Sequence, residues 1–166
     1  MGLFEPVLVA LDRVDVRCVI VGGVATVLHG YARLTADLDL AIDLTPDRPM
    51  RAIEALLELG LLPRLPVDAR DFADPDVRRT WIDQRNLRVF SMYDRANPLL
   101  QVDLFAEGPI PFEDLWLRSV EVELSTVSAR IACIDDLISM KRTAGRPQDL
   151  ADVEALELIQ RGEADR

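Results

Sequence analysis

The chain has 166 residues, of which 49% are hydrophobic and 29% are charged, and its formal net charge is -10. This composition is typical of one folded domain with a substantial core, here residues 1–166, and it excludes a disordered chain. The acidic charge disfavours tight, unspecific binding of duplex DNA, because like charges repel at long range.

Charged residues or proline interrupt every apolar run before it reaches the roughly 20 residues of a membrane-spanning helix. Residues 1–13 contain acids and lack a basic segment, so they do not resemble a secretory signal. Only Cys18 and Cys133 are present, and both lie in apolar, strand-like runs where reduced core thiols are expected. We therefore predict a cytoplasmic protein without a membrane partner.

The first quarter of the chain shows alternating elements. Residues 3–14 have the apolar spacing of a helix, and the β-branched run 17–21 predicts a buried strand. The turn at Gly22-Gly23 is followed by helical spacing over residues 24–31. A second strand is expected over residues 38–42, so that two strands flank one helix.

The rest of the chain continues this alternation. Thr45-Pro46 predicts a helix start, with Thr as N-cap, and Gly60 a helix end. Asp74-Pro75 opens another predicted helix, which contains Trp81 as a packing residue. Further strands are expected over residues 87–93, 99–105, 121–124 and 129–133, and two helices over 134–144 and 147–160. Together these elements predict an α/β (α+β) fold, a mixed sheet with helices packed mainly on one face.

Two acidic residues mark the second predicted strand. Because side chains alternate along a strand, Asp37 and Asp39 would share one face while Leu38 and Leu40 point into the core. Two carboxylates on one face repel each other unless a cation lies between them. Mg²⁺ prefers such hard oxygen ligands and commonly binds one or two carboxylates together with substrate phosphates. A solvated edge strand is the alternative interpretation.

A third carboxylate and a glycine turn complete the predicted site. Asp103 interrupts an otherwise apolar strand, where burial without a cation or hydrogen bonds would be costly. Gly22 and Gly23 allow a ligand to approach the backbone, and the helix that follows offers free N–H groups to an anion. A metal dyad next to a phosphate site is what nucleotidyl or phosphoryl transfer requires.

These motifs resemble a known superfamily. The order Gly22-Gly23, helix, Asp37-Leu38-Asp39 and later Asp103 is similar to that of the DNA-polymerase-β-like nucleotidyltransferases. The C-terminal pattern, Lys141 followed by Arg-x-x-Asp-x-x-Asp at residues 146–152, resembles the AbiEii-type toxin branch and its uncharacterised relatives. The resemblance covers nearly the whole chain and implies a nucleotidyltransferase fold.

The resemblance also implies a reaction and roles for residues. A nucleotide would pass from an NTP to an acceptor hydroxyl with two Mg²⁺ ions. Asp37 and Asp39 would bind both metals, and Asp103 would hold the catalytic metal and help to deprotonate the acceptor. The phosphates would contact Gly22, Gly23 and Thr26.

Helical spacing adds further candidates. Thr26, His29 and Arg33 fall on one polar stripe that begins at the glycine turn and could face the nucleotide. For His29, the sole histidine, a hydrogen-bonding role is as expected as ligand contact. For Arg33, a solvated charge is an equal alternative.

The C-terminal helices supply one more candidate cation. Lys141 lies on the apolar stripe of its helix, which is unusual unless it reaches an anion such as a nucleotide phosphate. Asp149 and Asp152 border the apolar stripe of the last helix and could meet Lys141, which would make its role purely structural.

Two classes of function remain open from the sequence. An active enzyme would use an RNA end, a protein or a small molecule as acceptor. The alternative is a non-catalytic nucleotide-binding or protein-interaction module, for example one half of a toxin–antitoxin pair with an antitoxin-type protein partner.

Overall fold

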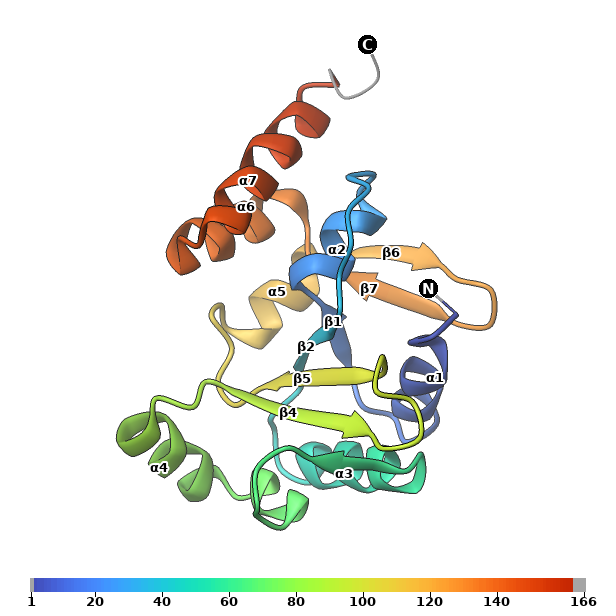
Figure 1. The fold of residues 1–166 in the computed structure, drawn as a ribbon, viewed down its shortest axis with the longest axis vertical. Coiled ribbons are helices and arrows are strands. Elements are labelled where there is room, and N and C mark those ends of the chain that lie inside the picture. Colours follow the sequence, from blue (N-terminus) through green and yellow to red (C-terminus); the bar gives the residue numbers. More distant parts are fainter. Residues whose placement is uncertain (1, 163–166) are drawn as a thin grey trace.

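A computed structural model describes residues 2–162 of the chain. One mixed sheet of seven strands, in the order β3-β4-β5-β2-β1-β7-β6, runs through the molecule (Figure 1). Its strands are β1 (Cys18–Ile20), β2 (Leu38–Ile42), β3 (Leu61–Pro63), β4 (Val89–Asp94), β5 (Gln101–Phe105), β6 (Val120–Glu123) and β7 (Ser128–Ile131). β2 runs parallel to β5 and antiparallel to β1, whereas β1 runs parallel to β7. The predicted mixed-sheet α/β fold is confirmed.

Seven α-helices and one short 3-10 helix accompany the strands within the described residues. They are α1 (Glu5–Arg13), α2 (Gly22–Leu28), α3 (Arg48–Glu58), η1 (Ala69–Ala73), α4 (Pro75–Arg85), α5 (Phe112–Arg118), α6 (Ile134–Ala144) and α7 (Pro147–Gln160). The predicted bounds of β2, α6 and α7 match the structure. Figure 1 shows α6 and α7 side by side as a hairpin at one end of the molecule.

The predicted helix start at Thr45-Pro46 is wrong. The helix α3 begins at Arg48, after Asp47 in a left-handed conformation (φ 70°). Thr45 instead donates its backbone N–H (3.0 Å) and its hydroxyl (2.7 Å) to the Asp43 carboxylate. The side chain of Asp43 thus forms a turn that competes with helix formation, and Pro49 occupies the first turn of α3 in place of Pro46.

Three short elements are absent from the predictions. These are β3, η1 and α5, each of three to seven residues. Segments of this length show too few turns or alternations for their periodicity to be recognised. β3 exists because its partner β4 supplies the hydrogen bonds of the ladder, which is a contact between segments distant in sequence.

The two faces of the sheet differ in polarity around β2 and β5. On one face the side chains of Leu38, Leu40, Val102 and Leu104 are completely buried. They belong to one core cluster that also contains Val7 and Leu11 of α1 and Ile53 and Leu56 of α3. On the other face the alternate residues Asp39 and Asp103 are half-buried. Polar groups at the second face therefore remain partly accessible to solvent.

The packing prediction for Trp81 agrees with the structure, since Trp81 is buried and stacks on Phe90, with 5.4 Å between ring centroids. Cys18 and Cys133 are free thiols, and burial raises the pKa of Cys18 to about 12. Cys133 is half-buried and directly precedes α6, so the prediction that it is a core residue of a strand is wrong. Between residues 2 and 162, no helix combines the length and the apolar composition that a membrane span requires.

Candidate active site

Three carboxylates meet on the polar face of the sheet. Asp37 precedes β2, Asp39 lies within it, and Asp103 lies directly beside Asp39 on the parallel neighbour β5. Side chains at paired positions of neighbouring strands share a face, which brings the third acid to the first two. One oxygen of each carboxylate lies within 4.8 Å of the others. The structure thus gathers the three acids that the sequence selects.

The ionised carboxylates repel one another when no cation is present. Burial, followed by the charges of Asp37 and Asp103, raises the pKa of Asp39 to about 7, although the Gly23 N–H and Lys141 oppose this rise. Burial also raises the pKa of Asp103, partly offset by hydrogen bonds from Ser91 and Gln101. Three half-buried acids within reach of one another repel, so a divalent cation would stabilise their ionised forms.

The glycine turn packs directly against this cluster. Gly22 has a φ of +62°, and a Cβ built on it would lie 1.9 Å from Asp39 Oδ2. Gly23 is enclosed on its other side, where a Cβ would lie 2.4 Å from Thr35 Oγ1 and 2.6 Å from a terminal nitrogen of Arg33. Both positions therefore require glycine for the close approach of other side chains, in addition to any contact with a ligand.

Thr26 and His29 make hydrogen bonds inside the protein. The hydroxyl of the fully buried Thr26 donates to the Gly22 carbonyl at 2.9 Å. His29 Nε2 lies 2.8 Å from the Ala132 carbonyl, which joins the end of α2 to the segment before α6. Of the two interpretations of His29, the structure shows the hydrogen-bonding one.

Arg33 and Lys141 share one acidic partner. Asp152 Oδ2 accepts from Lys141 Nζ at 2.5 Å and lies 3.1 Å from Arg33 Nη2. The side chain of Asp152 is 0% exposed and that of Lys141 5% exposed, while Arg33 Nε is buried without a hydrogen-bond partner. The predicted contact of Lys141 with Asp152 is present, whereas Asp149 pairs with Arg146 instead. Two cations on one carboxylate leave a positive charge beside the acidic cluster.

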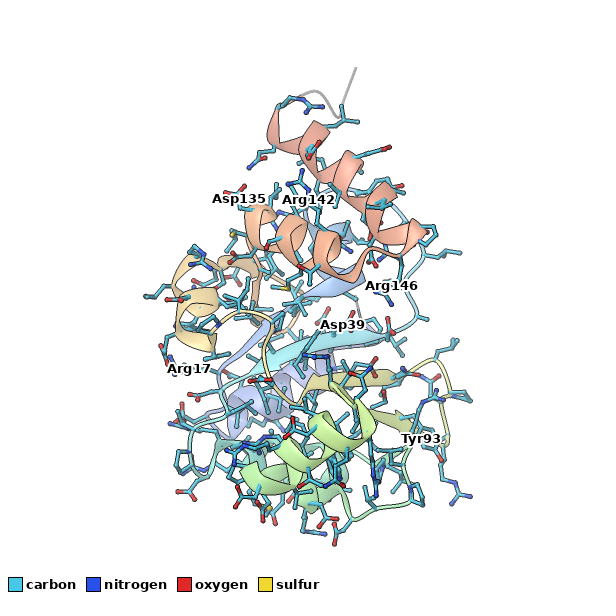
Figure 2. All side chains as sticks on the ribbon, turned by 90° about the vertical axis from the view of Figure 1, so that its left-hand side faces the viewer. Arg17, Asp39, Tyr93, Asp135, Arg142 and Arg146 are labelled. Carbon is cyan, nitrogen blue, oxygen red and sulfur yellow. The ribbon has the colours of Figure 1, made fainter. Side chains whose placement is uncertain are left out.

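Three further polar residues near the cluster were not predicted. Arg146 lies in the turn between α6 and α7. Its pKa is raised because it pairs with Asp149 and because the negative charges of Asp39 and Asp37 also stabilise its protonated form. Gln101 donates to Asp103 Oδ1 at 3.1 Å, and Arg64 donates to Gln101 at 2.6 Å. Figure 2 shows Asp39 between Arg146 on one side and Tyr93 on the other. The alternation of β5 places Gln101 on the face of Asp103, so this residue could have been selected from the sequence.

Comparison with known proteins assigns the chain to a family. Residues 2–166 match the family described as "Nucleotidyltransferase of unknown function (DUF6036)". No curated protein matches the sequence. The crystal structure of the lincosamide antibiotic adenylyltransferase LnuA, with lincomycin bound, is similar in fold, with a TM-score of 0.65 and 14% sequence identity over 96% of this chain and 97% of that chain. The prediction of a nucleotidyltransferase is therefore confirmed. The chain belongs to the DUF6036 family of nucleotidyltransferases.

Proposed function

We propose that the protein transfers a nucleoside monophosphate from an NTP to an acceptor hydroxyl in a Mg²⁺-dependent reaction. The observation that carries this proposal is the convergence of Asp37, Asp39 and Asp103, whose carboxylate oxygens lie within 4.8 Å of one another. Hard oxygen ligands at this spacing fit Mg²⁺, which prefers carboxylates and retains positions for water and phosphate. Two ions are expected, with Asp37 and Asp39 bound to both and Asp103 to one.

The nucleotide would bind on the side of Gly22 and Gly23. Arg33 packs against Gly23 and, together with Lys141, outnumbers the single carboxylate of Asp152. The surplus positive charge favours a triphosphate there. Because Lys141 is buried and paired, it would act on the phosphates through its field and by holding Asp152 rather than by contact. Thr26 would support the turn, since its hydroxyl is bound to the Gly22 carbonyl.

The chemistry requires a deprotonated hydroxyl and a stabilised leaving group. The acceptor oxygen would attack the α-phosphorus, the bond from that phosphorus to the bridging oxygen would break, and pyrophosphate would leave. Asp103, which would also hold the catalytic metal, would help to deprotonate the hydroxyl. Bound Mg²⁺ would supply charge stabilisation for the phosphate oxygens. Ser91 and Gln101 would orient the carboxylate of Asp103 through their hydrogen bonds.

For the acceptor, we propose only a class of molecule that carries a hydroxyl group. An RNA end, a protein side chain or a small molecule would each provide a hydroxyl, and the fold neighbour LnuA, an adenylyltransferase, was crystallised with the small molecule lincomycin. Membership of the AbiEii-type branch and pairing with an antitoxin-type protein stay predictions. A toxin would arrest growth when expressed alone, and Asp39→Asn would abolish the arrest. Normal growth at high expression of active protein would contradict the toxin role.

Calorimetric titration with each NTP, with and without Mg²⁺, tests the proposed function. We expect one or more NTPs to bind only with Mg²⁺, and binding to disappear in a variant carrying Asp37→Ala and Asp39→Ala. A matched control is Asp83→Asn, which changes an exposed acid of α4 and should leave binding unchanged. If folded wild-type protein binds no NTP, the proposal fails for this chain.

A further inference from the structure

Polar residues continue from the acidic cluster across the sheet, away from the glycine turn. Ser91 of β4 lies directly opposite Asp103, and Tyr93 lies opposite Gln101. Arg64 follows β3 and donates its backbone N–H to the Ser91 carbonyl at 3.0 Å. The order across this face is therefore Arg64, then β4, then Asp103 and then Asp39, with Gly22 against Asp39. Arg64 lies on the opposite side of Asp103 from the proposed nucleotide.

The guanidinium of Arg64 is held in place by neutral groups. It donates to Gln101 Oε1 at 2.6 Å and lies over the ring of Tyr93, 5.5 Å from the centroid. Within residues 2–162, no carboxylate oxygen lies within 4.0 Å of its nitrogens, whereas Arg33 and Arg146 each have an acidic partner. In a chain with a net charge of -10, this exposed cation remains free to pair with an anionic ligand.

Gln101 connects this cation to Asp103, the proposed proton acceptor. Its amide nitrogen donates to Asp103 Oδ1 at 3.1 Å, while its amide oxygen accepts from Arg64. Two hydrogen bonds therefore connect Arg64 to the carboxylate that receives the hydroxyl proton, and an anionic group bound at Arg64 would add a third. Arginine recognises phosphate and carboxylate oxygens through its planar array of N–H donors.

We propose, on the basis of the proposed transferase function, that Arg64, Tyr93 and Gln101 form the acceptor subsite. Arg64 binds an oxyanion, a phosphate or a carboxylate, that the acceptor carries close to the hydroxyl that receives the nucleotide. Tyr93 and Gln101 fix the guanidinium, and Gln101 sets the spacing between the oxyanion and Asp103. An acceptor that lacks an oxyanion at this spacing is selected against.

An NMR titration of the full chain with inorganic phosphate tests this subsite. The protein is first saturated with Mg²⁺ and a non-hydrolysable analogue of the NTP that binds, and phosphate is then added while the Arg64 side-chain and Gln101 amide resonances are followed. We expect saturable shifts of these resonances. Arg64→Gln should weaken phosphate binding roughly tenfold or more, because a charge-assisted contact is lost. Arg88→Gln, which removes an exposed arginine before β4, is the matched control and should bind phosphate normally.

Other outcomes distinguish the alternatives. Stronger binding of phosphate than of acetate would assign a phosphate ester to the acceptor, and the reverse order would assign a carboxylate. If the nucleotide analogue displaces phosphate from Arg64, the residue serves the triphosphate and the proposal is wrong. Equal phosphate binding by Arg64→Gln and wild type would also overturn it. If no NTP binds, the proposed function fails, while the same titration of nucleotide-free protein still tests Arg64 as an oxyanion site.

Discussion

Gly22 and Asp39 are in such close contact that a side chain at residue 22 would overlap the observed position of the Asp39 carboxylate. A Cβ at residue 22 would lie 1.9 Å from Asp39 Oδ2, and the φ of +62° independently favours glycine. The first residue of the glycine motif therefore fixes the geometry of the acidic cluster directly. This contact links two of the motifs, the glycine turn and the paired acids, on which the resemblance to nucleotidyltransferases rests.

Replacing Gly22 by alanine should displace the Asp39 carboxylate. We expect Mg²⁺-dependent NTP binding to weaken roughly 10–100-fold, because the groups that orient a metal ligand contribute about this much to metal affinity. The backbone strain should cost about 1–3 kcal/mol. Calorimetry and urea unfolding measure the two effects. Gly60→Ala is the control, because Gly60 has a φ of +89° but no atom within 4 Å of an added Cβ. If both variants bind NTP equally well, the contact with Asp39 is unimportant.

The raised pKa of Asp39 predicts a dependence of stability on pH in the absence of metal. The pKa is about 7 in the folded protein, against an ordinary value of 3.8, so the folded state holds the proton more tightly than the unfolded state. The contribution of this proton to the free energy of unfolding is fully present below pH 3.8. It decreases at higher pH and is lost as the pH rises through about 7.

Asp39→Asn should remove this dependence. Without metal, we expect the variant to match the wild type near pH 4 and to exceed it in stability at pH 8, with a slope of at most about 1.4 kcal/mol per pH unit for one proton. Mg²⁺ should stabilise the wild type at pH 8 and have little effect on the variant. Urea unfolding at several pH values measures this difference. A difference that does not change with pH would show that Asp39 titrates normally.

The buried cluster of Arg33, Lys141 and Asp152 predicts an asymmetry between two substitutions. Asp152→Asn leaves two cations without a counter-charge, which should cost about 3–5 kcal/mol in the free energy of unfolding. Lys141→Met should cost less, because Arg33 still neutralises Asp152 at 3.1 Å. Denaturant unfolding measures both.

The exposed pair of Arg142 and Glu157 provides the reference for this comparison. Arg142→Gln should change the free energy of unfolding by roughly 0–1 kcal/mol, as is usual for surface ion pairs. A larger loss from Lys141→Met than from Asp152→Asn would contradict the proposed balance of charges.

Gln101 provides a prediction on turnover rather than on binding. Gln101→Leu keeps the volume of the side chain but removes the hydrogen bond to Asp103. Once an acceptor is known, we expect kcat to fall while Mg²⁺-dependent NTP binding stays unchanged, because Gln101 orients the proton acceptor and does not touch the nucleotide. Gln101→Glu would place a carboxylate against Arg64, so it should lower the affinity for an anionic acceptor as well as kcat. Equal kcat for wild type and Gln101→Leu would exclude this orienting role.

The local patterns of the sequence were sufficient for most of the acidic cluster. Alternation along two strands placed Asp39 and Asp103 on the polar face, and the helical stripe brought Lys141 to Asp152. Arg64 could not be selected in this way, because it reaches Asp103 only through the register of β3, β4 and β5. Pairing between distant segments leaves no periodicity in the sequence. The helix start at Thr45 failed for a local reason, since the Asp43 side chain binds Thr45 in a turn.

Electron paramagnetic resonance of Mn²⁺, used in place of Mg²⁺, tests the central claim most directly. The spectrum of free Mn²⁺ is recorded with protein and NTP for the wild type, Asp39→Asn, Asp103→Asn and the control Asp83→Asn. We predict that the wild type and Asp83→Asn bind Mn²⁺ in the presence of NTP, and that Asp39→Asn and Asp103→Asn each lose most of this binding. Equal Mn²⁺ binding by all four proteins would contradict the assignment of these carboxylates as metal ligands.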